Sequence, residues 1–491
     1  MLLVDPYLAR EDPMERKFVE LYPSLGVLSL AAFLRDRGMD VAVTDLTFAR
    51  STRPAAEAMR RHRPQLVGVH TKSLTLPRAL EVARLAREAG ALAVAGGPDA
   101  ATRPESYLDG GFDVVATGEG ELTLLELAGR AAIGAPYADV AGTVSRVSGR
   151  LRRAPARPFL KELDSLPLPA WELIDMEGYL RRWQARTGER RAALLTSRGC
   201  PFDCSWCSKP AFGRSFRQQS PARVLEEIEA LVRDYRVDYL RFCDDVFGIE
   251  RHWLEQLLDG LEERGLRIRF ECLARVDLLK TDLLARLKRA GLERVYLGVE
   301  SGSQKMLDAM NRGTRLAQIE RVAEALRAAE VRQFWFLMLG YPGETLEDIE
   351  ATLALFRRFS PEEYSVSIAV PLPGTRFYES VKDRLRGERA RGRTGGTSLL
   401  YEAAYPESLY RWEQRRFQWE GALRSLQGRM DGAVARKLQR TADRFDREVA
   451  TPILLGRAPA RRPRAAARRR SRVPERVAQL RTTLLARRLS R

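Results

Sequence analysis

Residues 196–207 read TSRGCPFDCSWC, with cysteines at positions 200, 204 and 207. This stretch directly follows residues 192–196, an apolar run short enough to be a buried strand. Three thiolates on one tight loop suit three irons of a four-iron cluster and leave the fourth iron open to a small molecule. A structural zinc site would need a fourth Cys or His nearby. The spacing therefore predicts that Cys200, Cys204 and Cys207 bind an iron–sulfur cluster, and zinc is the alternative.

Alternating strand-like and helix-like segments follow the cysteine stretch. Helical segments separate six predicted strands, at residues 192–196, 239–243, 267–272, 294–299, 333–339 and 364–370. Such alternation is typical of a parallel sheet flanked by helices. Six units are too few for a closed eight-fold barrel, so we expect a partial (β/α)6 barrel of the TIM type over residues 191–376. Chemistry in such barrels lies at the carboxyl ends of the strands, where the cysteines are predicted to be.

Residues 1–135 show a second alternating α/β pattern, which predicts a Rossmann-like domain. Three of its strand-like runs end in short polar or glycine-containing segments, at residues 70–74, 96–99 and 118–121. Ligands of open parallel sheets bind beyond these strand ends, and glycine allows the backbone to approach a ligand closely. We therefore expect a ligand site on these three segments.

The remaining residues differ in composition from these two domains. Residues 136–190 include the Pro-rich stretch LDSLPLPAW and are predicted to be a linker. Residues 377–455 are predicted to be helical, except for a flexible loop at 384–397. Residues 456–491 are Arg-rich, a composition typical of a disordered tail.

The net charge of the 491-residue chain is +18, and it is concentrated at one end. Residues 457–491 contain thirteen arginines and one acidic residue, so this tail carries +12 and the rest of the chain only +6. Nucleic acid is therefore not required as the main partner, although the tail is expected to contact anionic surfaces weakly. The apolar run at 25–34 is shorter than the roughly 20 residues of a membrane span. Without a transmembrane segment or a signal peptide pattern, we expect a cytoplasmic protein.

The sequence resembles the radical S-adenosylmethionine (SAM) superfamily. The resemblance rests on the three cysteines, on Trp206 before the last of them, and on five motifs that end successive predicted strands. These are CDDVF at 243–247, ECLAR at 271–275, GVESGS at 298–303, LGYPGET at 339–345 and PLPGT at 371–375.

Residues 1–135 resemble, more loosely, the cobalamin-binding domain that precedes the catalytic domain in one branch of that superfamily. The D-x-H-x-x-G signature of many cobalamin proteins is absent. The resemblance therefore implies a cobalt without the usual histidine ligand. In the alternative, the domain has lost cobalamin and serves as a scaffold.

The resemblance implies three cofactors: a [4Fe-4S] cluster, SAM and cobalamin. The cluster would cleave SAM reductively to a 5′-deoxyadenosyl radical, and methylcobalamin would give a methyl group to an unactivated carbon of the substrate. The expected partners are a small, lipid-like or tetrapyrrole-like substrate and an electron donor such as flavodoxin or ferredoxin. One alternative is an oxidoreductase of the same architecture that transfers no methyl group, similar to the anaerobic magnesium-protoporphyrin monomethyl ester cyclase. A second is a zinc-binding or nucleic-acid-binding protein without catalytic activity.

The resemblance and the positions at strand ends also assign residue roles. Asp244 and Asp245 would accept hydrogen bonds from the SAM amino group or the substrate, and the Arg275 fork would pair with the SAM carboxylate. Glu300 and Ser301 would hold the ribose hydroxyls. Gly340 would shape the turn beside the adenine of SAM, and Trp206 would pack on the cluster. The alternative for these side chains is a structural role, as a helix cap, a salt bridge or loop packing.

The expected cobalamin site lies on the first domain. His70 is predicted to be a neighbour or a ligand of cobalt, and otherwise a polar loop residue. The other expected contacts are Thr71, Ser73, Gly96, Gly97, Pro98, Gly118, Glu119 and Glu121. Outside these sites, Cys243 and Cys272 are interpreted as small buried residues on strands.

Overall fold

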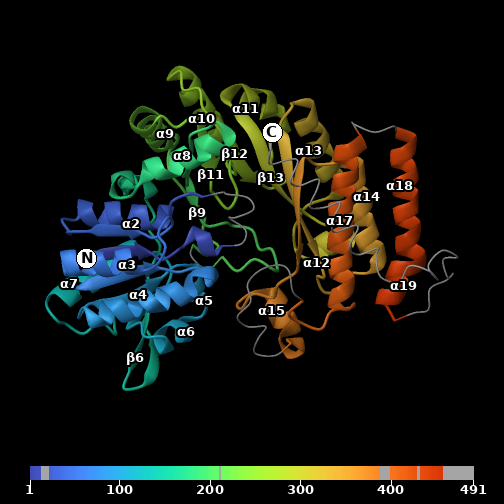
Figure 1. The fold of residues 1–491 in the computed structure, drawn as a ribbon. Helices are drawn as coiled ribbons and strands as arrows, with labels where there is room; N and C mark the ends of the chain where they lie inside the picture. Colours follow the sequence, from blue (N-terminus) through green and yellow to red (C-terminus); the bar gives the residue numbers. More distant parts are fainter. Residues whose placement is uncertain (13–20, 210–211, 387–398, 428–431, 457–491) are drawn as a thin grey trace. The chain divides into compact units, whose positions relative to one another are not determined.

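The structure is a computed structural model that describes residues 1–12, 21–209, 212–386, 399–427 and 432–456 (Figure 1). It divides into two compact units, residues 1–402 and residues 403–491. The first unit contains two α/β sheets with their helices. The second unit is helical over its described residues and is treated separately.

The first sheet has seven strands in the order β2-β1-β3-β4-β5-β6-β7. Its first five strands are parallel to one another. They are β1 (Leu2–Asp5), β2 (Ala42–Asp45), β3 (Leu66–His70), β4 (Leu92–Gly96) and β5 (Val114–Ala116). The order 2-1-3-4-5 is that of a doubly wound, flavodoxin-like sheet, so the predicted Rossmann-like architecture is confirmed. The main flanking helices are α2 (Leu25–Asp36), α3 (Arg53–His62), α4 (Leu76–Glu88) and α7 (Glu121–Ala132).

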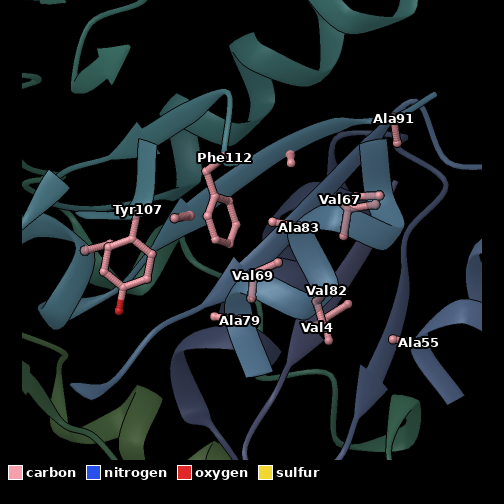
Figure 2. Packing of buried hydrophobic residues seen from close by; sticks show 14 of the residues in the cluster. Val4, Ala55, Val67, Val69, Ala79, Val82, Ala83, Ala91, Tyr107 and Phe112 are labelled. Atoms are coloured by element: carbon pink, nitrogen blue, oxygen red, sulfur yellow. The ribbon is translucent and has the colours of Figure 1, made fainter. Parts of the chain in front are cut away.

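Small apolar side chains form the core between this sheet and its helices. Figure 2 shows Val67 and Val69 of β3 beside Val82 and Ala83 of α4. All four side chains are almost completely buried. Their small size allows helix and strand to approach closely. The larger Tyr107, on the short helix α6 (Pro104–Asp109), belongs to the same buried cluster (Figure 2).

The predicted linker, residues 136–190, contains structure of its own. A hairpin of β6 (Thr143–Val147) and β7 (Arg150–Arg153) joins the first sheet, because β6 pairs antiparallel with β5. All four residues of β7 are exposed, so the strand lacks the apolar alternation by which strands are predicted. A helix, α8 (Met176–Thr187), follows later in the same segment.

The second sheet is entirely parallel, with six strands in the order β15-β14-β13-β12-β11-β8. The strands are β8 (Arg191–Leu194), β11 (Tyr239–Phe242), β12 (Arg269–Ala274), β13 (Leu292–Glu300), β14 (Arg332–Leu339) and β15 (Glu363–Ile368). The helices between them are α9 (Pro221–Tyr235), α10 (Arg251–Glu263), α11 (Leu284–Ala290), α12 (Gln304–Ala309), α13 (Leu316–Ala328) and α14 (Leu346–Phe359). The predicted partial barrel of six β/α units is confirmed.

The described C-terminal residues are helical, as predicted. After β15 come α15 (Arg376–Val381) in the first unit and α17 (Glu407–Gln427), α18 (Gly432–Phe445) and α19 (Thr451–Leu454) in the second. Most of the predicted flexible loop, residues 387–397, and nearly all of the predicted tail, residues 457–491, lie outside the described residues. None of the helices described here combines the length and the apolar composition needed to cross a membrane.

Candidate functional site

The cysteine loop begins where β8 ends, at the carboxyl edge of the second sheet. A short strand, β9 (Ser197–Arg198), pairs antiparallel with β10 (Arg217–Gln218) and leads into the loop. Gly199 has a φ of +83°, and a Cβ there would lie 1.7 Å from the carbonyl oxygen of Ser215. Only glycine fits this position, so the turn into Cys200 depends on it.

The three thiols lie in a buried and positively charged environment. Cys200 and Cys204 are buried and Cys207 is partly buried. Burial raises the pKa of the Cys207 thiol to about 11 and also raises the pKa of Cys200. Two guanidinium groups donate to the third thiol, since Arg275 Nη1 and Arg312 Nη1 each lie 3.4 Å from Cys204 Sγ. Cationic donors at this distance suit an iron–sulfur cluster, whose cysteine ligands are thiolates.

The zinc alternative gains no support from the arrangement of side chains. Among the described residues, no three His, Cys, Asp or Glu side chains form a group that could hold a single metal ion. The C-x3-C-x2-C spacing instead matches the ligand set of a cluster, in which each thiolate binds a different iron.

Asp244 directly follows Cys243 after β11 and supports the strand that carries the loop. Its Oδ1 accepts hydrogen bonds from the amide and hydroxyl groups of Thr196, both at 3.0 Å, and of Ser197, at 2.5 and 2.6 Å. Burial raises the pKa of this carboxyl to about 6 despite these bonds. Its Oδ2 has no hydrogen-bond partner among the described residues, so one buried acceptor remains for a ligand.

Arg275 is held at the end of β12 by protein groups. Its Nε and Nη2 donate to the two carboxylate oxygens of Asp277, each at 3.0 Å, and its guanidinium lies 3.9 Å from the centre of the Phe202 ring. These partners place the side chain against the cysteine loop. Its predicted pairing with the SAM carboxylate stays a prediction.

Glu300 ends β13 in the left-handed region, with a φ of +64°, after a register shift in the pairing with β14. Its carboxylate is buried, 3.9 Å from Arg312 Nη2, and burial raises its pKa. Non-glycine residues in this conformation concentrate at functional sites. The neighbouring Ser301 is fully buried, with its hydroxyl 3.0 Å from Thr352 Oγ1, and accepts from the Ser303 amide. These contacts support a structural role for Ser301, and its contact with ribose stays a prediction.

The remaining predicted residues of the barrel also lie at strand ends. Gly340 follows β14 with a φ of +78°, donates its amide to Glu344 Oε2 and accepts from the Tyr401 hydroxyl. Asp245 is exposed, and the indole Nε1 of Trp206 is buried without a hydrogen-bond partner in the described part of the chain.

The two remaining cysteines have opposite environments. Cys272 is buried in the apolar layer beside Phe247 and Leu254, as predicted. The interpretation of Cys243 as a buried strand residue is wrong, because it lies one residue beyond the end of β11 and is exposed. Strand alternation carries no information about a residue placed just after the strand.

The predicted cobalamin segments meet at the carboxyl edge of the first sheet. His70 ends β3 and Asp5 ends β1, and these adjacent strands form the switch point where ligands of such sheets bind. His70 Nδ1 lies 3.2 Å from Ser24 Oγ and 3.6 Å from Asp5 Oδ2. Burial alone would raise the pKa of Asp5, but the neighbouring His70 imidazole lowers it. Both contacts lie on the Nδ1 side of the ring, and the role of His70 as a neighbour or ligand of cobalt stays a prediction.

Thr71 and Ser73 connect this edge to the segment after β4. The Thr71 amide and hydroxyl both donate to the carbonyl of Gly96, at 2.7 and 3.0 Å, and Ser73 Oγ donates to Asp99 Oδ1 at 2.5 Å. Gly97, before the exposed Pro98, has a φ of +111°, and a Cβ there would lie 2.7 Å from the Thr71 carbonyl oxygen. The two segments therefore form one rigid rim.

The segment after β5 differs from what the sequence predicts. Gly118 is exposed, but the side chains of Glu119 and Glu121 are buried and paired with arginines. Glu119 Oε1 accepts from Arg198 Nη1 at 2.9 Å, and Glu121 Oε1 accepts from Arg198 Nη2 at 2.6 Å. These carboxylates thus contact the strand before the cysteine loop, and their contact with cobalamin stays a prediction. Arg198 is not among the site residues predicted from the sequence. Its position two residues before Cys200 is the one feature of the sequence that could have indicated it.

Comparisons with known proteins agree with these two sites. Residues 194–356 match the Radical SAM superfamily, and residues 15–128 match the B12 binding domain. The chain is a radical SAM enzyme with a B12-binding domain. Its cofactors are therefore a [4Fe-4S] cluster, SAM and cobalamin.

Similar proteins are known across most of this length. An uncharacterized methyltransferase of Pyrococcus horikoshii is 29% identical over 388 residues, which are 77% of this chain and 82% of that protein. The anaerobic magnesium-protoporphyrin IX monomethyl ester cyclase of Cereibacter sphaeroides is 29% identical over 73% of this chain, and the match spans only 59% of the cyclase. The solved radical SAM methyltransferase TsrM of Kitasatospora setae, with cobalamin and a [4Fe-4S] cluster bound, has the same fold, with a TM-score of 0.66 at 19% identity over 88% of this chain and 89% of TsrM.

The residues of this radical SAM enzyme fit its cofactors. The cysteine loop supplies three thiols beside two arginines, and the unpaired Oδ2 of Asp244 supplies a buried acceptor for a donor such as the SAM amino group. The B12-binding domain supplies an oriented imidazole, that of His70, and a glycine rim at its switch point. The chemistry of these groups therefore agrees with the family assignment.

Proposed function

We propose that this radical SAM enzyme is a cobalamin-dependent methyltransferase that transfers a methyl group to an unactivated carbon. The observation that carries the proposal is a direct contact between the segment after β5 in the B12-binding domain and the strand that leads into the cysteine loop. Arg198, two residues before Cys200, is bound by both glutamates of the segment after β5. Methyl transfer from cobalamin to a substrate radical requires both cofactors at one substrate, and a contact between the two domains serves that requirement.

The bound cofactors supply reductive cleavage of SAM and a transferable methyl group. In this proposal the protein holds and orients them. Cys200, Cys204 and Cys207 bind the cluster, and Asp244 Oδ2 accepts a hydrogen bond from the SAM amino group. Arg275 and Arg312 would donate to the cluster ligand Cys204, and Glu300 and Gly340 would hold the nucleoside part of SAM. His70 would be a neighbour or a ligand of cobalt when cobalamin is bound.

A second candidate is radical oxidation or cyclisation without methyl transfer. It is favoured by the similarity to the magnesium-protoporphyrin cyclase, whose identity to this chain equals that of the methyltransferase relative. The two candidates share the cofactors and differ in the use of SAM. Methyl transfer consumes a second SAM and yields S-adenosylhomocysteine, whereas the oxidative reaction yields no stoichiometric S-adenosylhomocysteine.

The test needs no knowledge of the substrate. The chain is reconstituted anaerobically with iron, sulfide and hydroxocobalamin, and bound iron and cobalamin are counted. We expect about four irons and one cobalamin per chain. The loaded protein is then reduced and given SAM with a deuterated methyl group. Appearance of labelled methylcobalamin and an equal amount of S-adenosylhomocysteine would support methyl transfer. Four irons with cobalamin but no label on it would favour the oxidative candidate.

The proposal includes the setting of the reaction. The substrate is a small, lipid-like or tetrapyrrole-like molecule, and a flavodoxin or ferredoxin supplies the electrons for SAM cleavage. We place the enzyme in the cytoplasm, where such donors and SAM occur. The Arg-rich tail contributes weak attraction to anionic surfaces.

A further inference from the structure

Four charged side chains join the two domains of the first unit, and we call them the loop clamp: Glu119, Glu121, Arg198 and Arg217. Glu119 Oε1 accepts from Arg198 Nη1 at 2.9 Å and from Arg217 Nη1 at 2.7 Å, and Glu121 Oε1 accepts from Arg198 Nη2 at 2.6 Å. The side chains are between 4% and 11% exposed. Buried charges in this arrangement are tightly fixed, because each loses strong hydrogen bonds if it moves.

The backbone of the connecting segment, residues 136–190 between the two domains, also binds the clamp. The amide of Leu160 donates to Glu119 Oε2 at 2.7 Å, and the carbonyl of Leu160 accepts from Arg217 Nη1 at 2.8 Å. Both oxygens of Glu119 are thus used by the protein. The clamp therefore links the B12-binding domain, the connecting segment and the radical SAM domain.

The clamp also determines the shape of the short ribbon before the cysteine loop. Arg198 of β9 and Arg217 of β10 are direct partners in the antiparallel register. Like charges in directly opposite positions destabilise a strand pair. The carboxylate of Glu119 binds both guanidinium groups and removes this repulsion. The ribbon therefore depends on a side chain of the other domain.

Only Gly199 separates the β9–β10 ribbon from Cys200, the first cluster ligand. In the B12-binding domain, Glu119 and Glu121 lie on either side of Gly120, where α7 begins. We propose that the loop clamp holds the cluster-binding loop at a fixed distance from the cobalamin-binding edge. Its members are positioning residues, and this inference rests on the proposed function. Buried ion pairs contribute little net stability compared with apolar residues, which agrees with a role in geometry.

The test uses the full chain loaded with both cofactors. In Glu121→Gln, Arg198 loses one charged partner while Glu119 still bridges the two arginines. In Arg198→Lys the charge remains, but the two-pronged contact is lost. The control is Glu126→Gln, because Glu126 also lies between two arginines, Arg130 at 3.1 Å and Arg157 at 2.5 Å, within the first domain and its connecting segment. Circular dichroism and thermal unfolding establish that each variant folds.

The decisive measurement is the magnetic interaction between reduced cluster and cob(II)alamin, recorded by continuous-wave and pulsed EPR. In the wild type and in Glu126→Gln, we expect one narrow distribution of distances between the two spins. In Glu121→Gln and Arg198→Lys, we expect normal iron and cobalamin contents with a broadened or shifted distribution. General destabilisation alone would lower cofactor contents and leave the distribution of the loaded fraction unchanged.

Two outcomes separate the failure of this inference from that of the proposed function. Variants that load both cofactors and give the wild-type distance distribution would overturn the loop clamp as a positioning element. A wild type that binds the cluster but no cobalamin would instead overturn the proposed function. If Arg198→Lys does not fold, Glu121→Gln alone decides, because it leaves both contacts of Glu119 in place.

Discussion

Replacing Asp244 tests whether the cysteine loop depends on one buried carboxylate oxygen. Two backbone amides and two hydroxyls donate to Asp244 Oδ1, all from Thr196 and Ser197. Asp244→Ala leaves the four donors without an acceptor, whereas Asp244→Asn removes the charge and keeps an oxygen in place. The difference between the two variants therefore isolates the hydrogen bonds from the charge.

The structure gives the size of this difference. The hydroxyls can turn to other acceptors, but the two amides are fixed, and each orphaned buried donor costs about 1–3 kcal/mol. We therefore expect Asp244→Ala to be less stable than Asp244→Asn by about 2–6 kcal/mol. The alanine variant should also lose iron after reconstitution, because Thr196 and Ser197 lead into the loop.

The charge has a separate signature in the pH dependence. Burial raises the pKa of Asp244 to about 6, so the folded protein binds this proton more tightly than the unfolded chain. The stability that this group contributes is complete below about pH 4 and is lost as the pH rises through 6, which amounts to about 3 kcal/mol. Asp244→Asn lacks this slope.

Urea unfolding of the three proteins between pH 4 and 8, with iron analysis at each end, measures both effects. Equal unfolding free energies of the alanine and asparagine variants would refute the proposed support of the loop by Oδ1. A wild-type curve parallel to that of the asparagine variant would show that the carboxylate is not buried as described.

Three further predictions concern the same edge of the barrel. Gly199→Ala places a methyl group 1.7 Å from the Ser215 carbonyl oxygen at a positive φ, so we expect the free energy of unfolding to fall by at least about 1–3 kcal/mol in thermal unfolding. The variant should also bind less iron, and a wild-type iron content would contradict this prediction. Burial raises the pKa of Glu227 to about 7, so the free energy of unfolding should fall as the pH rises from 4.5 to 7. Urea titrations of Glu227→Gln should lack this pH dependence, and an unchanged dependence would contradict the burial of the carboxyl group. Arg312→Gln removes a positively charged donor 3.4 Å from Cys204 Sγ, which makes the added electron less favourable. An EPR-monitored redox titration should therefore give a cluster reduction potential lower by about tens of millivolts. An equal or higher potential would show that Arg312 does not tune the cluster.

The parts of the fold that the sequence predicts are those with a local signal. The six strands of the barrel are short segments that are either rich in apolar residues or alternate apolar and polar residues, as β15 does, so each is evident in a window of a few residues. The hairpin of β6 and β7 was missed because its exposed second strand carries arginines at three of its four positions. Its place in the sheet depends on pairing with β5, which no local pattern reports.

The candidate site divides in the same way. Cysteine spacing is local, and it predicts Cys200, Cys204 and Cys207 directly. The arginine partners of Glu119 and Glu121 lie more than 70 residues away in the chain, so neither the strand-end position nor the family resemblance predicts this ion pairing. Polar residues at such positions serve either a ligand or a neighbouring domain, and only the three-dimensional structure distinguishes the two.

The loop clamp has a consequence for how this architecture can be recombined. A chimera that takes its B12-binding domain from one relative and its barrel from another would bring together glutamates and arginines that were never matched. The buried charges would then lack partners, since Glu119 and Glu121 belong to one parent and Arg198 and Arg217 to the other. A functional exchange of domains therefore has to transfer these four residues as a set, and the boundary of the exchangeable module lies within the barrel, after β10, rather than in the connecting segment.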